Sequence, residues 1–444
     1  MFEKVLIANR GEIALRVIRS CRERGLRTVA VHSDIDADAL HTRLADEAIC
    51  IGPADPARSY LHIPAIIAAA EVTGADAVHP GYGFLSENAE FAETCAQCGL
   101  EFIGPLPEQM RQWGDKVSAR ALAKSLGLPI LRGTELVEDV EDAVKKAESL
   151  GFPVLLKASG GGGGRGMHVL QSTEELRSVF ETARAESRAA FGNDALYFEK
   201  FIERPRHIEF QILGDRHGNI HVLGERECSI QRRHQKILEE APSVALTTEM
   251  RNDMSATIRR AMGEVGYVSA GTLEFLLDES GELTFLEMNP RIQVEHPVTE
   301  LVMGIDLVAE QIRIADGQTL ELPTRPLTPR GHAIECRINA EDPDTFAPSP
   351  GKITELHMAG GTGVRVDSGV YGGGRVPPHY DPLIAKLIVH APTRAQAISK
   401  MRRALSETII GGIRTNIPLH QRILEHPAFE EGRISTRFLE ELRA

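Results

Sequence analysis

The sequence lacks the marks of several common protein classes. It has one Trp and six cysteines in 444 residues, and so few cysteines do not indicate a disulfide framework. Its longest apolar run, residues 63–70, is far shorter than the roughly 20 residues that span a membrane. With 63 acidic and 50 basic residues the formal charge is −13, which makes the chain a poor general ligand for nucleic acid. We therefore expect no nucleic acid and no membrane among its partners.

Two further absences bear on compartment and metal chemistry. No secretory signal precedes the first strand-like run, so we expect a cytoplasmic protein. Cys95 and Cys98 form a lone Cys-x-x-Cys pair, a spacing that serves metal or redox chemistry in some proteins. The second pair that would complete a zinc site is missing from the sequence. Two positions of one helix are the simpler interpretation.

Familiar nucleotide-binding motifs are also missing. The sequence has no Gly-x-x-x-x-Gly-Lys-Ser/Thr, so it is not a P-loop protein. It has no Gly-x-Gly-x-x-Gly after the first strand-like run, residues 5–8, where a dinucleotide-binding fold would carry it. The motifs His-Arg-Asp and Asp-Phe-Gly are absent, which excludes a protein kinase.

The sequence does contain an alternation of strand and helix patterns. Strand-like runs at 5–8, 28–31 and 75–79 alternate with segments of helical periodicity. This βαβ order predicts a parallel sheet, and hence an α/β fold, in the N-terminal part. A long helix is predicted at 249–265. At roughly 150 residues per domain, the length suggests about three domains.

A run of glycines follows a predicted strand. Residues 160–164 and 166 are Gly, and the strand at 154–157 ends on Lys157. Glycine lets backbone amides approach phosphate oxygens closely, and Lys157 would neutralise phosphate charge beside the loop. We interpret the run as a phosphate-binding loop, with a flexible linker as the alternative.

Two glutamates point to a metal site. Two predicted strands form a hairpin, and a loop over residues 279–282 would place Glu274 opposite Glu287. Like charges that face each other destabilise a sheet, so we expect a cation between them. Asn289 follows two residues later on the same face, and two carboxylates with an amide oxygen suit Mg²⁺. The alternative is a hairpin face open to solvent.

The segment after the hairpin carries a second set of polar side chains. On an extended chain Arg291, Gln293 and Glu295 share one face. Arg, Gln and a backbone amide form a fork for a small planar oxyanion, and Glu295 beside it would act as a general base. Upstream, residues 227–236 are dense in cations. These cations either form a basic surface loop or supply ligands, Lys236 among them, to the same anion.

Long motifs throughout the chain resemble those of one family. Residues 287–300, Glu-Met-Asn-Pro-Arg-Ile-Gln-Val-Glu-His-Pro-Val-Thr-Glu, resemble the signature of biotin-dependent carboxylases. Other motifs of that family resemble residues 8–14, 79–88, 157–167, 231–236 and 335–343. The resemblance runs from the first strand to the end of the chain. It is strongest to the biotin carboxylase subunits of bacterial acetyl-CoA carboxylases.

The resemblance implies an ATP-grasp fold of the α/β class. A Rossmann-like N-terminal βαβ domain would span residues 1–114. The ATP-grasp domain would span 115–330, and its mobile lid, about 130–203, would hold the glycine loop. A C-terminal α+β domain would span 331–444.

The resemblance also implies a role for each candidate residue. The implied ATP ligands are Lys116, Lys157, Gly163, Gly164, Glu199, Lys200, Phe201, Ile202, His207, Gln231, His234, Glu274 and Glu287. The implied ligands of two Mg²⁺ or Mn²⁺ ions are Glu274, Glu287 and Asn289. The implied bicarbonate ligands are Lys236, Arg291, Gln293, the amide of Val294, and the base Glu295. Tyr82 would lie near biotin, and Arg337 would stabilise the biotin enolate and complete a catalytic set with Glu295, Arg291 and Lys236.

The implied reaction is the carboxylation of biotin by ATP and bicarbonate, through carboxyphosphate, the first half-reaction of acetyl-CoA carboxylase in fatty acid synthesis. The sequence has no Ala-Met-Lys-Met attachment motif, so we expect the biotin on a separate biotin carboxyl carrier protein. Carboxyltransferase subunits and a second copy of the chain are the other expected partners. Thr362 stands where some members place an aromatic residue at the dimer contact.

Three alternatives remain for the function. The chain could be the same subunit of another acyl-CoA carboxylase, another ATP-grasp ligase, or a non-catalytic nucleotide-binding regulator. Lys236, Arg291, Glu295 and Arg337 favour a bicarbonate-activating carboxylase over another ligase. A regulator would tolerate loss of Glu274 or Glu295, and both are present.

Overall fold

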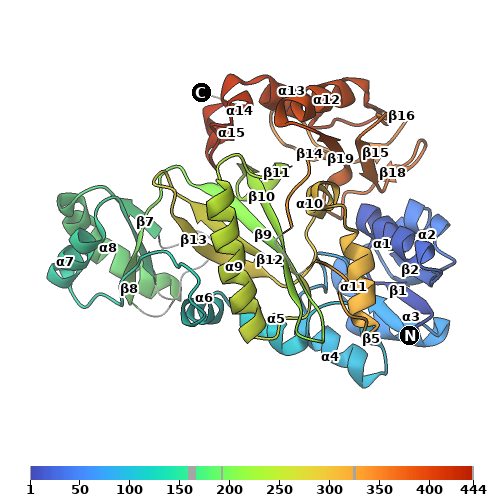
Figure 1. The fold of residues 1–444 in the computed structure, drawn as a ribbon, viewed down its shortest axis with the longest axis horizontal. Coiled ribbons are helices and arrows are strands. Elements are labelled where there is room, and N and C mark those ends of the chain that lie inside the picture. The colour runs from blue at the N-terminus through green and yellow to red at the C-terminus, as the bar shows by residue number, and fades with distance from the viewer. Residues whose placement is uncertain (1, 159–166, 192–193, 324–326, 443–444) are drawn as a thin grey trace. The chain divides into compact units, whose positions relative to one another are not determined.

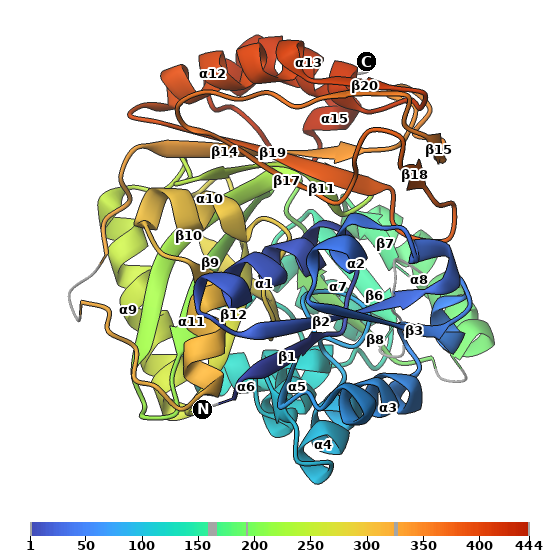
Figure 2. The same cartoon turned by 90° about the vertical axis from the view of Figure 1, so that its right-hand side faces the viewer.

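The structure is a computed structural model that describes residues 2–158, 167–191, 194–323 and 327–442. It contains two compact units (Figures 1 and 2). Unit 1 comprises Met1–Leu128, Arg206–Phe275 and Glu287–Ala444, and unit 2 comprises Pro129–Pro205 and Leu276–Leu286. Among the described residues, no helix combines the length and the apolar character needed to cross a membrane.

The N-terminal part of unit 1 contains the predicted parallel sheet, in the order β3-β2-β1-β4-β5. Its strands are β1 (Lys4–Ile7), β2 (Arg27–Ser33), β3 (Glu47–Gly52), β4 (Ala77–His79) and β5 (Glu101–Phe102). Val5, Leu6 and Ile7 are fully buried, as expected of a parallel strand that is covered on both faces. The helices here are α1 (Gly11–Glu23), α2 (Leu40–Leu44), α3 (Ile63–Thr73), α4 (Ala89–Gln97), α5 (Pro107–Gly114) and α6 (Lys116–Ser125). Cys95 is buried on α4 and Cys98 caps that helix, as the helix interpretation predicts.

A second, larger sheet has the order β13-β12-β9-β10-β11-β14-β19-β17. Its strands are β9 (Arg206–Gly214), β10 (Ile220–Arg232), β11 (Gln235–Ala241), β12 (Ser269–Leu277), β13 (Leu283–Asn289), β14 (His332–Asn339), β17 (Val364–Ser368) and β19 (Leu383–Ala391). Antiparallel pairing of β11 with β14 runs across the boundary predicted between residues 330 and 331. The two predicted domains therefore share one sheet, and the domain bounds stay a prediction.

Helices cover this sheet and join it to the N-terminal part. They are α9 (Thr248–Glu264), α10 (His296–Met303), α11 (Leu307–Ala315), α12 (Arg394–Glu407), α13 (Ile417–Glu425), α14 (Pro427–Glu430) and α15 (Phe438–Glu441). Figure 2 shows α12 lying along β14 and β19, which it contacts. Two short ribbons, β15 (Gly351–Lys352) with β18 (Arg375–Val376) and β16 (Glu355–His357) with β20 (Ile409–Gly411), complete this part. The bounds of α9 confirm the helix predicted at 249–265.

Unit 2 is a small sheet packed against two helices. Its strands, in the order β7-β6-β8, are β6 (Val154–Ala158), β7 (Met167–Leu170) and β8 (Leu196–Lys200), and its helices are α7 (Val140–Leu150) and α8 (Thr173–Phe191). Val154, Leu156, Phe180 and Phe198 are buried in its core. The lid predicted at about 130–203 falls within this unit. The predicted glycine loop at 160–166 lies outside the described residues.

Candidate active site

The candidate residues of unit 1 gather around Lys236 on β11. Its ammonium group lies 2.8 Å from Glu274 Oε1 and 2.7 Å from Glu295 Oε1, and it also contacts Glu209. Burial would lower the pKa of Lys236, but these carboxylates outweigh burial and raise it well above its usual value. The ammonium group therefore stays charged and holds together carboxylates that would otherwise repel one another. We call Lys236, Glu209, Glu274, Glu295 and Arg337 the Lys236 cluster.

Glu274 is the most densely contacted carboxylate of the cluster. Besides Lys236, its Oε1 accepts hydrogen bonds from Asn289 Nδ2 at 2.9 Å and Gln293 Nε2 at 2.8 Å. Its Oε2 lies 3.0 Å from Nε2 of His207 on β9. Burial would raise the pKa of Glu274, but Lys236 and His207 lower it well below its usual value. Glu274 is therefore ionised and available as an oxygen ligand.

Glu295 lies at the start of α10, where it occupies the N-cap position. Its side chain is 2% exposed, and Arg337 Nη2 on β14 donates to its Oε2 at 2.9 Å. Burial would raise the pKa of Glu295, but Lys236, Arg337 and Arg226 lower it. Arg337 also donates from Nε to Glu239 Oε1 at 2.6 Å. Glu295 is thus a buried carboxylate clamped between two cations.

The segment from β13 to α10 is not extended, contrary to the sequence-based prediction. It bends at residues 290–291 and turns at 294–295, because the Arg291 N–H donates to the Asn289 carbonyl at 2.9 Å and α10, with Pro297 in its first turn, begins at His296. Gln293 and Glu295 still reach the Lys236 cluster. The Arg291 guanidinium group instead pairs with Glu87 at 2.5 Å and donates to Asn289 Oδ1 at 3.2 Å.

The predicted metal ligands are partly brought together. Glu274 and Asn289 are in contact, as described above. Glu287 is half-buried on β13, two residues before Asn289. The N–H of Asp278 donates to the carbonyl of Glu282 and closes a hairpin loop one residue shorter than predicted. The loop predicted at 279–282 is therefore wrong by one residue, and the direct opposition of Glu274 and Glu287 stays a prediction.

The remaining candidates of unit 1 lie at varied depths. Gln231 is buried and its Nε2 contacts His207 Nδ1 at 2.8 Å, whereas His234 is exposed at the tip of the β10–β11 hairpin, where its φ is +68°. Tyr82 donates its hydroxyl hydrogen bond to Glu12. Lys116 begins α6. The structure thus places His207 beside Glu274, Gln231 beside His207, and His234 outside the Lys236 cluster.

Unit 2 carries the other predicted ATP ligands. Lys157, near the end of β6, pairs with Glu199 on β8 at 2.9 Å. Lys200 donates to the carbonyls of Gly151 and Phe152, and the half-buried residues Phe201 and Ile202 follow it. The predicted ligands Gly163 and Gly164 lie outside the described residues. The roles of these residues in ATP binding stay predictions.

Sequence reasoning missed Arg226 on β10, which contacts the Lys236 cluster through Glu209. Its side chain is fully buried and pairs with Glu209. It also donates to Gln293 Oε1 at 2.9 Å and Thr299 Oγ1 at 2.9 Å, so it holds the Gln293 amide in the orientation that donates to Glu274. The available signal was a run of charged residues, Glu225 to Glu227, inside a predicted strand segment, since charged side chains that become buried must find partners.

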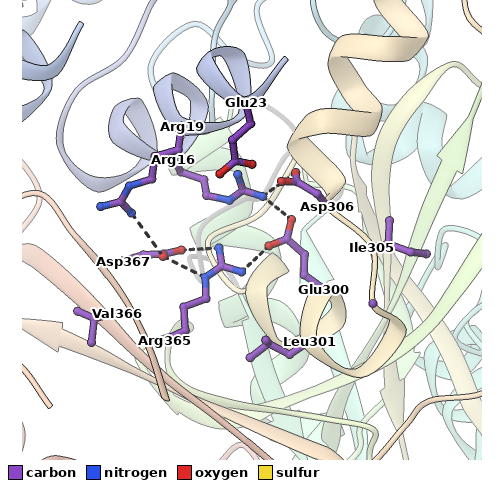
Figure 3. A pocket seen from close by; sticks show the side chains of 11 residues that line it. Arg16, Arg19, Glu23, Glu300, Leu301, Ile305, Asp306, Arg365, Val366 and Asp367 are labelled. Atoms are coloured by element: carbon purple, nitrogen blue, oxygen red, sulfur yellow. Dashed lines mark hydrogen bonds and ion pairs between the residues drawn. The ribbon is translucent and has the colours of Figure 1, made fainter. Parts of the chain in front are cut away.

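A separate pocket of unit 1 contains a second group of charges (Figure 3). Arg365 on β17 forms a bidentate pair with Asp367, at 2.7 and 3.0 Å, and donates to Glu300 at 2.6 Å. Arg16 on α1 donates to the other oxygen of Glu300 at 2.8 Å and to Asp306 at 2.7 Å. We call these five residues the Arg365 cluster.

Comparison with known proteins covers the whole chain. Family profiles match at residues 1–110 (biotin carboxylase, N-terminal domain), 115–323 (carbamoyl-phosphate synthase L chain, ATP binding domain) and 335–441 (biotin carboxylase C-terminal domain). Biotin carboxylase of Haemophilus influenzae is 57% identical over 99% of this chain and 98% of its own length.

Two solved structures agree with this. The biotin carboxylase domain dimer of Hydrogenobacter thermophilus 2-oxoglutarate carboxylase, in complex with MgADP, ADP and bicarbonate, is 49% identical, with a TM-score of 0.88, over 99% of this chain and 98% of that chain. The biotin carboxylase subunit of pyruvate carboxylase is also 49% identical, with a TM-score of 0.92, over the same shares of the two chains. The predicted family and ATP-grasp fold are confirmed. The chain therefore belongs to the biotin carboxylase family of ATP-dependent ligases.

Proposed function

We propose that this protein carboxylates biotin on a separate biotin carboxyl carrier protein, with ATP and bicarbonate, as the first half-reaction of an acetyl-CoA carboxylase. The observation that carries the proposal is the buried Glu295 carboxylate, held 2.7 Å from Lys236 and 2.9 Å from Arg337. This arrangement joins a base to two cations that attract an anionic substrate. Glu274 and its neighbours supply the oxygen ligands beside it.

Bicarbonate is bound by Lys236, Gln293 and the Val294 amide, and by Arg291 once its guanidinium group exchanges Glu87 for the anion. In the ligand-free site Lys236 neutralises Glu274 and Glu295, which keeps Glu295 a weak base. An anion that takes over part of the Lys236 interaction weakens the hold on Glu295, so its proton affinity rises as substrate binds. Glu295 then accepts the bicarbonate proton, and the bicarbonate oxygen attacks the γ-phosphorus of ATP to give carboxyphosphate and release ADP.

The side-chain oxygens at this site suit a hard divalent cation. Glu274 is ionised, Asn289 contacts it, and carboxylate and amide oxygens are the ligands that Mg²⁺ and Mn²⁺ prefer. With Glu287 these residues would hold two ions, provided the Asn289 amide turns its oxygen toward the metal. When bound, the ions neutralise charge on the ATP phosphates. The other ATP ligands that we propose are His207, Gln231, His234 and Lys116 in unit 1 and the candidates described above in unit 2.

Biotin is carboxylated at the Arg337 side of the cluster. Carboxyphosphate decomposes to CO₂ and phosphate, the phosphate takes the N1 proton of biotin, and N1 attacks CO₂ to form the new C–N bond. Arg337 stabilises the negative charge that develops on the ureido oxygen of biotin, and Tyr82 lines the biotin site. Arg337 is held for this role by Glu239, and its own carbonyl accepts hydrogen bonds from Asn416 and His420.

A homodimer and two protein partners belong to the proposal. The related domain of Hydrogenobacter thermophilus is described as a dimer, and we propose that a second copy of this chain packs at the face beside the Arg365 cluster, near Thr362. The carrier protein and carboxyltransferase subunits are the other partners. The similarity to the biotin carboxylase subunit of pyruvate carboxylase favours one second candidate function. In it, the carboxyl group passes from biotin to an acceptor other than acetyl-CoA.

Phosphate release from ATP tests the proposal. We expect release to require both bicarbonate and Mg²⁺, and free biotin to be carboxylated at the same time. ATP hydrolysis that is indifferent to bicarbonate would refute it. The two candidates are separated by adding purified carrier protein with carboxyltransferase subunits specific for either acetyl-CoA or pyruvate. The measurement is the amount of malonyl-CoA formed with the first and of oxaloacetate formed with the second.

A further inference from the structure

The turn between β13 and α10 contains the backbone amide that the bicarbonate site uses. The carbonyl of Gln293 accepts hydrogen bonds from the His296 ring at Nδ1, 2.7 Å away, and from the His296 N–H, 3.3 Å away. A peptide group is planar and trans, so its carbonyl and its N–H point in opposite directions. The N–H of Val294 belongs to this same peptide group. Holding the Gln293 carbonyl against His296 therefore turns the Val294 N–H away from His296.

The next peptide group is held by a second buried side chain. Nζ of Lys386 on β19 donates to the Val294 carbonyl at 2.8 Å. This lysine side chain is fully buried, and it lies 3.2 Å from Glu12 and 4.0 Å from Asp367. Burying an ammonium group is unfavourable unless carboxylates compensate it, and here they do. Lys386 thus acts as a charged anchor for a backbone carbonyl that lies one residue before the base.

His296 is suited to a fixed, uncharged role. Its side chain is fully buried, and since a carbonyl only accepts, the ring hydrogen must be on Nδ1. Among the described residues Nε2 has no hydrogen-bond partner. Burial, and then Lys386, Arg16 and Arg365, hold the pKa of His296 well below its usual value. The neutral tautomer that donates to Gln293 is therefore the stable form.

We propose that His296 and Lys386 are positioning residues of the bicarbonate site, which fix the peptide groups on either side of Val294 so that its N–H points at the anion. This inference rests on the proposed function, because it concerns the bicarbonate ligand named there. Neither residue touches the substrate. Their contribution is a backbone donor that is oriented before bicarbonate arrives and need not reorganise on binding.

The test compares two variants of His296, one that keeps a hydrogen-bond donor for the Gln293 carbonyl and one that removes it. In His296→Asn the side-chain amide nitrogen stands close to the Nδ1 position, whereas His296→Leu keeps the bulk without a donor. We expect His296→Leu to raise the KM for bicarbonate about tenfold or more, as for a lost hydrogen bond to an ion, and to leave the KM for ATP unchanged. We expect His296→Asn to restore most of the affinity. His41→Leu removes another fully buried imidazole, on α2, and should leave the KM for bicarbonate unchanged.

A second substitution tests the anchor on β19. Lys386→Met combined with Glu12→Gln removes the donor without leaving Glu12 as an unpaired buried charge, and we expect it also to raise the KM for bicarbonate selectively. Glu12→Gln alone is its control. If His296→Leu does not fold, His296→Gln, whose amide nitrogen reaches only the Nε2 position, takes its place.

The outcomes separate this inference from the proposed function. If the wild-type protein releases no phosphate in response to bicarbonate, the proposed function fails. If the wild-type protein is active but His296→Leu and the double variant bind bicarbonate normally, only the positioning inference fails. It also fails if the KM for ATP rises as much as that for bicarbonate, or if His296→Asn is as defective as His296→Leu.

Discussion

In the Lys236 cluster one ammonium group serves the carboxylates of Glu209, Glu274 and Glu295, whereas in the Arg365 cluster guanidinium groups hold each carboxylate in a fixed geometry. A lysine is a compact charge on a flexible stem, while arginine forms planar, directional pairs. The Lys236 cluster can therefore exchange one of its contacts for a ligand. The Arg365 cluster is better suited to fix α1 against β17 and α10.

The largest expected effect comes from removing either partner of the Glu295–Arg337 pair. We expect Glu295→Gln to lose biotin carboxylation and nearly all bicarbonate-dependent ATP cleavage, because both need deprotonated bicarbonate. Arg337→Ala should lose biotin carboxylation but retain slow ATP cleavage, because carboxyphosphate still forms and decomposes. Loss of one preorganised donor to a developing oxyanion reduces the rate by roughly a few hundred-fold.

Phosphate release and carboxybiotin formation, measured side by side for both variants, distinguish these roles. If Arg337→Ala loses ATP cleavage as completely as Glu295→Gln does, Arg337 belongs first to the bicarbonate site. If Glu295→Gln keeps ATP cleavage near the wild-type rate, another group is the base. A variant at the exposed Lys352 on β15, Lys352→Met, serves as a control for handling of the protein.

The elements that the sequence predicted well are those set by local pattern. The parallel strands and α9 follow from apolar periodicity, and β12 and β13 contain the two predicted hairpin strands that carry Glu274 and Glu287. The turn before α10 was missed because Arg291, Gln293 and Glu295 alternate as on a strand. Pro297, a residue suited to the first turn of a helix, was the signal against that interpretation.

The sequence predicted which residues belong to the site, but not which contacts they make. That Gln293 and Glu295 lie near Glu274 follows from their closeness in the sequence. Arg226 lies 67 residues from Gln293, and Lys386 lies 92 residues from Val294. Such pairs are created by strand order in the large sheet, which periodicity within a segment does not encode. The direction of the Arg291 side chain, toward Glu87, depends in the same way on a distant loop.

Next in size is the loss of stability expected from Lys236→Met. Removing the ammonium group leaves buried carboxylates uncompensated, and breaking a buried ion pair in this way costs about 3–5 kcal/mol. Urea unfolding of the ligand-free protein at neutral pH measures the loss. Because the orphaned carboxylates can take up protons, the deficit should shrink toward pH 5. A Lys236→Met protein as stable as the Lys352→Met control would show that the ammonium group does not hold the cluster together.

A smaller effect is expected from Arg365→Met. Arg16 remains on Glu300 at 2.8 Å and Lys386 remains 4.0 Å from Asp367, so neither carboxylate is left alone. We expect a loss of about 1–3 kcal/mol, as for hydrogen bonds between charged groups, with the kcat for bicarbonate-dependent ATP cleavage retained. Sedimentation of the same variant should show a weaker dimer. A stability loss as large as that of Lys236→Met would erase the difference between the two clusters.

The smallest effect concerns Glu335, whose carboxylate forms no ion pair in the part of the chain that the structure describes. Glu335 on β14 lies opposite Glu239 on β11, and among the described residues neither of its side-chain oxygens has a hydrogen-bond partner. Burial raises the pKa of Glu335 well above its usual value, because the charges of Lys386 and Arg337 only partly offset burial and the charge of Glu239. Burial likewise raises the pKa of Glu239 to about 7. The folded protein therefore binds more protons here than the unfolded chain above about pH 4.5. Its stability should fall as the pH rises through this window.

Glu335→Gln, which imitates the protonated acid, removes that penalty. We expect the variant to be more stable than the wild type at pH 8 by about 1 kcal/mol, the lower end of the penalty for an unsatisfied buried polar group, and the two proteins to converge near pH 5. Urea unfolding at both pH values measures the difference, and Glu279→Gln, in the exposed hairpin loop, is the matched control. Equal stability at pH 8 would mean that Glu335 already has a cation to balance it, as Glu274 and Glu295 do. A stability loss at pH 8 would mean that the ionised carboxylate is needed, and that the Lys236 cluster extends across β14.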